Sequence, residues 1–314
     1  MKITILDAGT LGEDINLSPL KNLGDCTIYS KTLPCDVKER IKTAEVVVIN
    51  KVKLFEENLK NAADLKLICL AATGFDNVDI EYCKSHGIAV CNVTGYSTHS
   101  VAQVAVSLVL YLFNHIPEYS DFVKSGEYTR SGIQNRLTPV YRELQGKTWG
   151  IVGYGNIGKQ VGCVAEAFGC RVIVNKRVPD DERYTDIDTL CRESDIITIH
   201  TPLTPETKEL INRDRIALMK KDAVVVNVAR GAVVDENALC DAVRDGNLGG
   251  IGTDVFSVEP MEENSPYTAV MNLPNVILTP HMAWGSFESR CRCIEEISEN
   301  IKSFFIGEKR NRVD

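Results

Sequence analysis

Short apolar runs rich in β-branched residues alternate with amphipathic stretches over the first hundred residues. The runs are 3–6, 26–29, 46–49, 67–70 and 88–91. Between them, stretches such as 54–65 and 79–86 carry apolar residues at helical spacing. This alternation is typical of βαβ units, whose mostly parallel sheet is covered by helices on both faces. The pattern therefore predicts one small α/β domain.

A second series of the same kind begins at residue 148. Its apolar runs are 148–152, 171–174, 195–200, 223–228, 250–255 and 276–278. This series predicts a second, larger parallel sheet, and a chain of 314 residues has room for two domains at about 150 residues each. We expect the last amphipathic pattern, 287–305, to pack back on the first domain. The polar segment 124–142 is expected to be an extended arm without regular structure.

Composition narrows the class of protein. With 44% hydrophobic and 25% charged residues the chain is globular, and its net charge of -8 makes nucleic acid an unlikely main ligand. The eleven cysteines include no Cys-x-x-Cys pair, so we expect reduced thiols, no metal and a cytoplasmic protein. The longest apolar stretch, 101–113, is too short to span a bilayer, and the N-terminus has no signal-peptide core.

A glycine-rich turn follows the first run of the second series. Gly153, Gly155 and Gly158 form a GxGxxG pattern between that run and a helical pattern, with Tyr154, Asn156 and Ile157 between them. Such glycines permit a tight turn, close approach of backbone N–H groups to a pyrophosphate, and close packing of helix on strand. In this context the motif predicts dinucleotide binding, whereas a lone motif is also compatible with an empty turn.

The next run ends without the acidic residue that holds the ribose 2′-hydroxyl in NAD sites. It ends in Asn175, Lys176 and Arg177, and nearby cations accommodate a 2′-phosphate instead. The sequence therefore favours NADP(H) over NAD(H). The alternative is a solvated basic pair, with Asp180 or Asp181 looping back to the ribose.

Three polar residues follow later runs of the second series: Arg230, Glu259 and His281. Because the carboxyl ends of parallel strands line the ligand crevice, we expect the three to converge. Arginine can hold a carboxylate, histidine can pass a proton to a carbonyl oxygen, and a glutamate on the other ring nitrogen fixes the tautomer. Each residue alone also fits a surface or loop role.

Several motifs in order resemble the D-isomer-specific 2-hydroxyacid dehydrogenase family over essentially the whole chain. These motifs are Ala72–Asp79, Gly95–Gln103, Gly153–Gly158, His200–Thr204, Asn227–Gly231, Asp254–Pro260 and Thr279–His281. The resemblance implies an α/β protein of two doubly wound parallel-sheet domains, a Rossmann dinucleotide-binding domain (99–286) inserted into a flavodoxin-like substrate domain (1–98 and 287–314). It also implies a cleft that closes around a hinge, and a homodimer built on the nucleotide-binding domains.

The resemblance assigns roles to individual residues. It implies that Arg230, Glu259 and His281 are catalytic, and that backbone N–H groups of Thr73 and Gly74 bind the substrate carboxylate. Lys51 and Trp284 are further candidate substrate contacts, and Asp254 is expected at the nicotinamide carboxamide. The remaining expected cofactor contacts are His200, Thr201, Pro202, Val228 and Ala229.

Within the family, the segments around Tyr96 and His281 look like the glycerate dehydrogenase, or hydroxypyruvate and glyoxylate reductase, branch. We therefore expect an NAD(P)-dependent enzyme acting on a small 2-oxo or 2-hydroxy acid, with no nucleic acid or membrane partner. Two alternatives stay open: a dinucleotide-sensing protein of the kind that serves as a transcriptional corepressor, and a dehydrogenase of phosphite or another 2-oxo acid.

Overall fold

The computed structural model describes residues 1–314, and the chain crosses twice between two folding units. The first unit contains residues 1–97 and 284–314, and the second contains residues 98–283. The crossings therefore fall at 97/98 and 283/284, where we expected 98/99 and 286/287. The second difference moves Trp284 into the first unit, because its side chain packs against the core of that unit.

The first unit is built on a five-stranded parallel sheet. Its strands are β1 (Lys2–Ile5), β2 (Asp25–Ile28), β3 (Val46–Ile49), β4 (Leu67–Leu70) and β5 (Ala89–Cys91). Their order is β2-β1-β3-β4-β5, the doubly wound order of flavodoxin-like domains. The chain therefore adds β2 on one side of β1 and the later strands on the other side. The parallel sheet that the alternating pattern predicts is confirmed.

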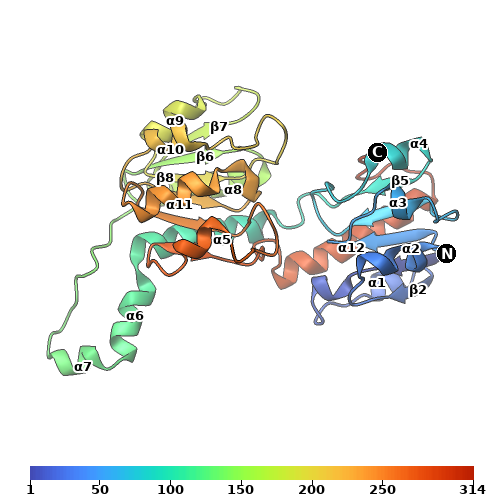
Figure 1. The fold of residues 1–314 in the computed structure, drawn as a ribbon, viewed down its shortest axis with the longest axis horizontal. Coiled ribbons are helices and arrows are strands. Elements are labelled where there is room, and N and C mark those ends of the chain that lie inside the picture. The colour runs from blue at the N-terminus through green and yellow to red at the C-terminus, as the bar shows by residue number, and fades with distance from the viewer. The chain divides into compact units, whose positions relative to one another are not determined.

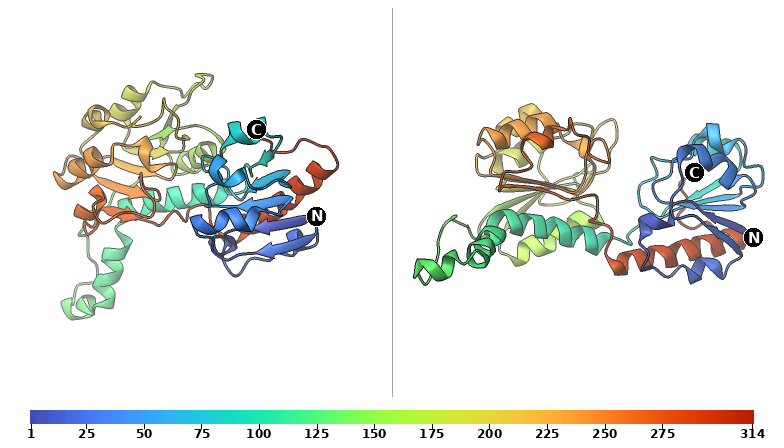
Figure 2. Two further views of the ribbon diagram at one scale, coloured as in Figure 1. Left: turned by 45° about the vertical axis from the view of Figure 1, so that its right-hand side comes forward. Right: turned by 60° about the horizontal axis from the view of Figure 1, so that its bottom comes forward.

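Side-chain alternation along the strands builds two cores in this unit. Val46 and Val48 of β3 belong to one buried cluster, whereas Val47 and Ile49 belong to another. The first cluster includes residues of α1 (Ser18–Lys21) and α12 (Phe287–Phe305), and the second includes residues of α2 (Val37–Ile41), α3 (Glu56–Leu59) and α4 (Ile80–Ser85). Both faces of the sheet are thus covered, and the prediction that the final helix packs on the first domain is confirmed (Figure 2).

The second unit is built on a six-stranded parallel sheet (Figure 1). Its strands are β6 (Thr148–Val152), β7 (Arg171–Asn175), β8 (Ile196–Ile199), β9 (Val224–Asn227), β10 (Gly250–Thr253) and β11 (Val276–Leu278). They are arranged in the order β11-β10-β9-β8-β6-β7. The prediction of two doubly wound α/β units is confirmed.

Two helical layers cover this second sheet. Helices α5 (Thr98–Asn114) and α8 (Asn156–Ala167) pack against each other on one face, and α9 (Ile187–Glu193), α10 (Arg213–Leu218) and α11 (Glu236–Arg244) form the layer on the other (Figures 1 and 2). The short 3-10 helices of the chain are η1 (Ala8–Leu11), η2 (Pro34–Asp36), η3 (Gly231–Val233) and η4 (Pro266–Ala269).

The segment expected to be an arm differs in part from the prediction. Helix α6 (Ile116–Lys124) leads into it, and a short helix, α7 (Glu127–Ser131), lies within it. Residues 125–126 and those after α7, up to β6, lack regular structure, so the expectation of an arm without regular structure is wrong for Lys124 and for 127–131. Aromatic contacts of Tyr128 with Phe122 and a hydrogen bond from Tyr128 to Gln134 O stabilise this local fold.

No single helix has both the length and the apolar character needed to cross a membrane. Helices α5 and α6, which meet at an angle of 61°, reach that criterion only when taken together, by length and composition alone.

Candidate active site

Polar side chains gather where β9, β10 and β11 end. Arg230 follows β9, Asp254 follows β10 directly, and His281 follows β11. Glu259 comes from the loop after β10. Because the three strands are parallel neighbours in the sheet, their carboxyl ends share one edge, and all four residues belong to the second unit.

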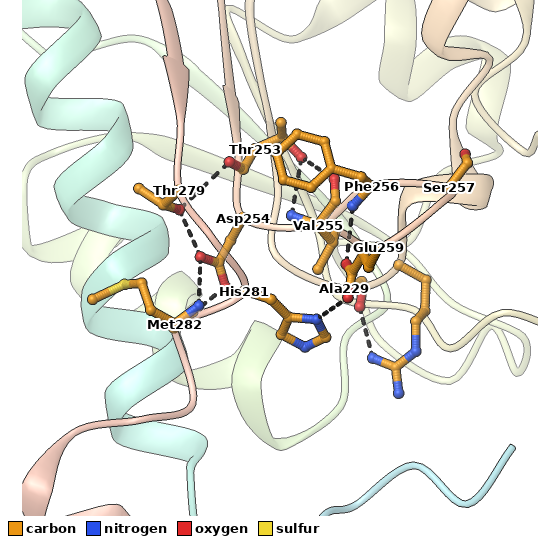
Figure 3. A network of polar contacts seen from close by, with 12 residues as sticks. Ala229, Thr253, Asp254, Val255, Phe256, Ser257, Glu259, Thr279, His281 and Met282 are labelled. Carbon is orange, nitrogen blue, oxygen red and sulfur yellow. Dashed lines mark hydrogen bonds and ion pairs between the residues drawn. The ribbon is translucent and has the colours of Figure 1, made fainter. Parts of the chain in front are cut away.

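Glu259 and His281 form a hydrogen-bonded pair. The Nδ1 atom of His281 lies 2.6 Å from Oε2 of Glu259 (Figure 3). The other carboxylate oxygen, Oε1, accepts a hydrogen bond of 3.0 Å from the backbone N–H of Phe256. With Nδ1 held by a carboxylate, the imidazole presents Nε2 as the atom that exchanges a proton.

The backbone of His281 has a conformation that few residues other than glycine adopt. Its φ is 53°, in the left-handed region. A hydrogen bond from His281 N to Thr279 O, 3.0 Å long, closes this tight turn. Such strained residues often occur at functional sites, where the surrounding structure holds them in place.

Asp254 provides the support for that turn. It is only 1% exposed, and its carboxylate accepts hydrogen bonds from Thr279 Oγ1 (2.6 Å), Met282 N (2.9 Å) and Ala283 N (2.8 Å) (Figure 3). A carboxylate has about four lone-pair sites, so three are already used within the protein. Asp254 thus joins the end of β10 to the segment that carries His281.

Arg230 extends from a loop that is fixed by Asn227. The side chain of Asn227 donates to Arg230 O (2.8 Å) and accepts from Ala229 N (3.0 Å). The guanidinium of Arg230 donates from Nη1 to Ala229 O (2.8 Å), which orients it beside its own loop. Val228 is buried, so any cofactor contact by the segment 228–229 is expected from its backbone or from Ala229.

The glycine-rich turn between β6 and α8 has room for an anion. Gly153 has φ = 91°, and a Cβ there would lie 2.6 Å from Thr201 N; a Cβ on Gly158 would collide with Gly153 O. A Cβ on Gly155, in contrast, would meet nothing within 4 Å. No side chain caps α8, so the N–H groups of its first turn are available to a ligand. The turn therefore fits a pyrophosphate.

His200 lies behind this turn and stays neutral. Both of its ring nitrogens are buried without a hydrogen-bond partner, and burial lowers its pKa to about 3. A neutral imidazole can line a cofactor pocket but supplies no positive charge to a phosphate. The backbone of Thr201 lies directly against Gly153. The carbonyl oxygen of Pro202 accepts a hydrogen bond from Thr207 Oγ1.

The end of β7 carries a mixed set of charges. Asn175 donates from its side chain to Thr185 O (3.0 Å), and Lys176 forms an ion pair with Asp180, whose pKa is lowered by that contact. Asp180 therefore loops back, but onto Lys176. The nearby Arg177 lies close enough to Glu206 to lower the pKa of that carboxyl, after the larger effect of a hydrogen bond from Thr204.

Sequence reasoning missed a third cation near this end of the sheet. Arg183 pairs with Asp181 (2.9 Å) and Glu166 (2.7 Å), and its guanidinium lies 4.8 Å from the ring centroid of Tyr154 in the glycine-rich turn. The pairing raises the pKa of Arg183 and lowers that of Asp181 to about 2. No spacing in the sequence marks Arg183, because a loop of irregular structure brings it back to the turn.

The candidate substrate contacts of the first unit lie on linked loops. The side chain of Asn77 donates to Asn50 O (3.2 Å) and Val52 O (2.9 Å), which joins the loop of Thr73 and Gly74 to that of Lys51. Thr73 Oγ1 donates to Val93 O (2.8 Å). Lys51 lines a cavity of about 850 Å³ in this unit.

Trp284 packs on the core of the first unit. Its ring centroid lies 6.5 Å from that of Tyr96, and its indole nitrogen is buried without a hydrogen-bond partner. Its role as a wall of the substrate pocket stays a prediction. Nowhere in the chain do three or more His, Cys, Asp or Glu side chains form a cluster suited to a metal ion.

Comparison with known proteins identifies the family. Residues 106–283 match the family model described as D-isomer specific 2-hydroxyacid dehydrogenase, NAD binding domain. The chain is 38% identical to a glycerate dehydrogenase of Methylorubrum extorquens over 90% of this chain and 89% of that one. It is 33% identical to a hydroxypyruvate reductase of Blautia hydrogenotrophica over the full length of both. The chain therefore belongs to the D-isomer-specific 2-hydroxyacid dehydrogenase family.

Solved structures agree with this assignment. A D-lactate dehydrogenase of Aquifex aeolicus, complexed with NAD and lactic acid, is 32% identical with a TM-score of 0.85 and covers 98% of this chain and 96% of that one. An NADPH-dependent glyoxylate/hydroxypyruvate reductase of Sinorhizobium meliloti, in complex with NADP and malonate, is 26% identical with a TM-score of 0.85. It covers 99% of this chain and 96% of that one. A nicotinamide cofactor is thus supported, and relatives differ in which one they hold.

The geometry of the glycine-rich turn gives a testable expectation. Gly155→Val would place its side chain in the open space above the start of α8, on an extended backbone (φ = -84°, ψ = -158°) that does not require glycine. We expect an unchanged melting temperature and binding of NADH and NADPH weakened at least about tenfold, or 1.4 kcal/mol. Titration of cofactor fluorescence measures this, and Gly153→Ala, which adds strain at positive φ, should instead lower the melting temperature. Unchanged binding by Gly155→Val would place the pyrophosphate elsewhere.

Proposed function

We propose that the protein is an NADPH-dependent reductase of small 2-oxo acids that converts hydroxypyruvate to D-glycerate or glyoxylate to glycolate. The observation that carries this proposal is the 2.6 Å contact of His281 with Glu259 on the sheet edge that also carries Arg230. The names of the relatives, a glycerate dehydrogenase and a hydroxypyruvate reductase, support the choice of substrate.

Each of the three side chains has one task in this reaction. Arg230 binds the substrate carboxylate, since a planar guanidinium can donate two parallel hydrogen bonds to it. His281 donates its Nε2 proton to the carbonyl oxygen as negative charge develops there. Glu259 keeps the imidazole in the required tautomer, with Nδ1 directed at its carboxylate. The bound reduced nicotinamide supplies the hydride to the carbonyl carbon.

The first unit holds three further candidate substrate contacts. Backbone N–H groups of Thr73 and Gly74 would bind a carboxylate, and Lys51 would contact the same molecule from the neighbouring loop. The hydrogen bonds of Asn77 to Asn50 and Val52 support this grouping, because they fix the two loops relative to each other.

The preference for NADPH rests on the end of β7. No carboxylate ends this strand, and Lys176 and Arg177 follow it directly. The ion pair of Lys176 with Asp180 weakens the attraction for a phosphate, but Asp180 is largely exposed, and exposed pairs contribute only about 0 to 1 kcal/mol. A dianionic 2′-phosphate can therefore displace Asp180 from Lys176.

Turnover by purified protein tests the proposed function directly. We expect NADPH oxidation, followed at 340 nm, with hydroxypyruvate and glyoxylate. His281→Ala should lower kcat by about 10²- to 10⁴-fold, the usual contribution of a general acid, with unchanged NADPH binding. His86→Ala, which alters a histidine stacked on Tyr82 in the first unit, is the matched control. Cofactor binding without turnover of any 2-oxo acid would instead favour a dinucleotide-sensing protein.

Cofactor preference has its own test. Lys176→Ala removes a charged hydrogen bond to the 2′-phosphate, which is worth about 1.5 to 3 kcal/mol, so kcat/KM for NADPH should fall about 10- to 100-fold. The value for NADH should not change. Asp180→Asn, which frees Lys176 from its ion pair, should raise kcat/KM for NADPH alone. An equal loss with both cofactors would remove Lys176 from 2′-phosphate recognition.

We also propose a homodimer formed through the segment 116–143. Its exposed apolar side chains include Ile133 (61% exposed), Leu137 (73%) and Val140 (68%), which a second copy of the chain would cover. Light scattering should give twice 34.7 kDa for the parent protein. Leu137→Asp combined with Val140→Asp should give the monomer mass, whereas Met271→Asp, an exposed apolar position outside the segment, should not. A monomeric parent protein would contradict the proposal.

A further inference from the structure

The backbone of Phe256 connects the three side chains of the proposed catalytic set. The N–H of Phe256 donates to Glu259, and Glu259 in turn contacts His281. The next peptide, between Phe256 and Ser257, packs directly on Gly231, the residue after Arg230, where a Cβ would collide with it. The position of the Phe256 backbone therefore affects where Glu259 lies relative to both partners.

Glu236 holds that peptide from the adjacent helix. It is the first residue of α11, and its Oε1 accepts a 2.8 Å hydrogen bond from the backbone N–H of Ser257. The side chain is half-buried, and burial, with a smaller contribution from nearby Glu259, raises its pKa. The function proposed above assigns no role to Glu236, although only the backbone of Phe256 separates the N–H group that Glu236 binds from the N–H group that Glu259 binds.

Neither helix capping nor ion pairing accounts for the placement of Glu236. The helix N-cap is already supplied by Asp235, whose side chain accepts from Ala238 N (2.9 Å). No ion pair of Glu236 with a basic side chain occurs, so its carboxylate does not link the helix to a cation of a neighbouring element. The hydrogen bond of Glu236 to the loop after β10 is therefore not part of the capping of α11.

We propose that Glu236 is a positioning residue for Glu259 and, through it, for His281. By accepting from Ser257 N–H it fixes the turn 256–259, which sets the direction from which the Glu259 carboxylate meets Nδ1 of His281. Glu236 does not touch substrate. The proposal rests on the proposed function for its kinetic part, because misplacing an acid–base pair by about 1 Å can cost about 10²-fold in rate.

Two substitutions separate the hydrogen bond from the charge. Glu236→Asp keeps the negative charge at the start of α11 but is one methylene too short to reach Ser257. Glu236→Gln keeps the reach and an acceptor oxygen but loses the charge. Both variants should lower the melting temperature modestly, the Gln variant because the helix N-terminus loses an acidic residue and the Asp variant because it loses the hydrogen bond.

Activity, in contrast, should distinguish the two variants. We expect kcat for hydroxypyruvate to fall about 10- to 100-fold for Glu236→Asp, within the range for a misplaced catalytic group, while NADPH binding is unchanged. Glu236→Gln should stay within about threefold of the parent protein, a difference of less than 1 kcal/mol. Asn237→Ala, an exposed neighbour in the same helical turn, is the matched control. Equal activity of the Asp variant and the parent, or equal loss in Asp and Gln variants, would overturn the proposal.

A double-mutant cycle tests whether the effect passes through Glu259. In a Glu259→Gln background, Glu236→Asp should cause little further loss, because the pair it positions is already altered. Full additivity of the two losses would overturn the proposal.

Amide hydrogen exchange gives a readout that does not need turnover. Ser257 N–H should exchange faster in Glu236→Asp and at the parent rate in Glu236→Gln. If the parent protein reduces no 2-oxo acid and this exchange pattern is nevertheless found, the proposed function fails while the link from Glu236 to the turn stands. An unchanged exchange rate in Glu236→Asp overturns the link itself.

Discussion

The buried carboxylate of Asp254 is the interaction on which the arrangement of the candidate site depends. It lies directly after β10 and accepts hydrogen bonds from the side chain of Thr279 and from the backbone N–H groups of Met282 and Ala283 after β11. A buried carboxylate that lost these donors would bear a large desolvation cost, so the chain after β11 is held tightly in place. His281, inside the held segment, therefore keeps its left-handed backbone and a defined direction toward Glu259.

Hydrophobic periodicity predicts the fold because it reports directly on burial. The apolar runs mark all eleven strands, and strands covered on both faces are apolar throughout, whereas the edge strand β2 alternates exposed and half-buried positions. The segment 124–142 was harder, because α7 has no buried residue and so leaves no periodic signal. The sequence also does not indicate that Trp284 packs in the first unit rather than the second. That placement depends on contacts with residues such as Tyr96, nearly two hundred positions away.

Candidate site residues were recognisable where they follow a strand. Arg230, Asp254 and His281 each come within a few residues of a strand end, and parallel topology brings those ends to one edge. Glu236 could not be found this way, because it begins a helix and reaches the site only through a backbone N–H of the β10 loop. The pairing of Lys176 with Asp180, too, depends on the path of an irregular loop, so the sequence indicated only that Asp180 or Asp181 could loop back, not which group it would meet.

The exposure of the Glu259–His281 pair indicates what keeps it together. The side chains are 33% and 22% exposed, and at such positions water and salt screen the attraction between charges. Coulombic attraction alone would therefore hold the pair weakly. The hydrogen bond from Phe256 N–H to the second carboxylate oxygen already restricts the Glu259 side chain. Pairing with His281 therefore costs Glu259 less conformational entropy. Hydrogen bonds of backbone N–H groups hold both residues in place: those of Met282 and Ala283 to Asp254 fix the segment of His281, and that of Phe256 fixes Glu259. This preorganisation thus contributes more to the site than charge does.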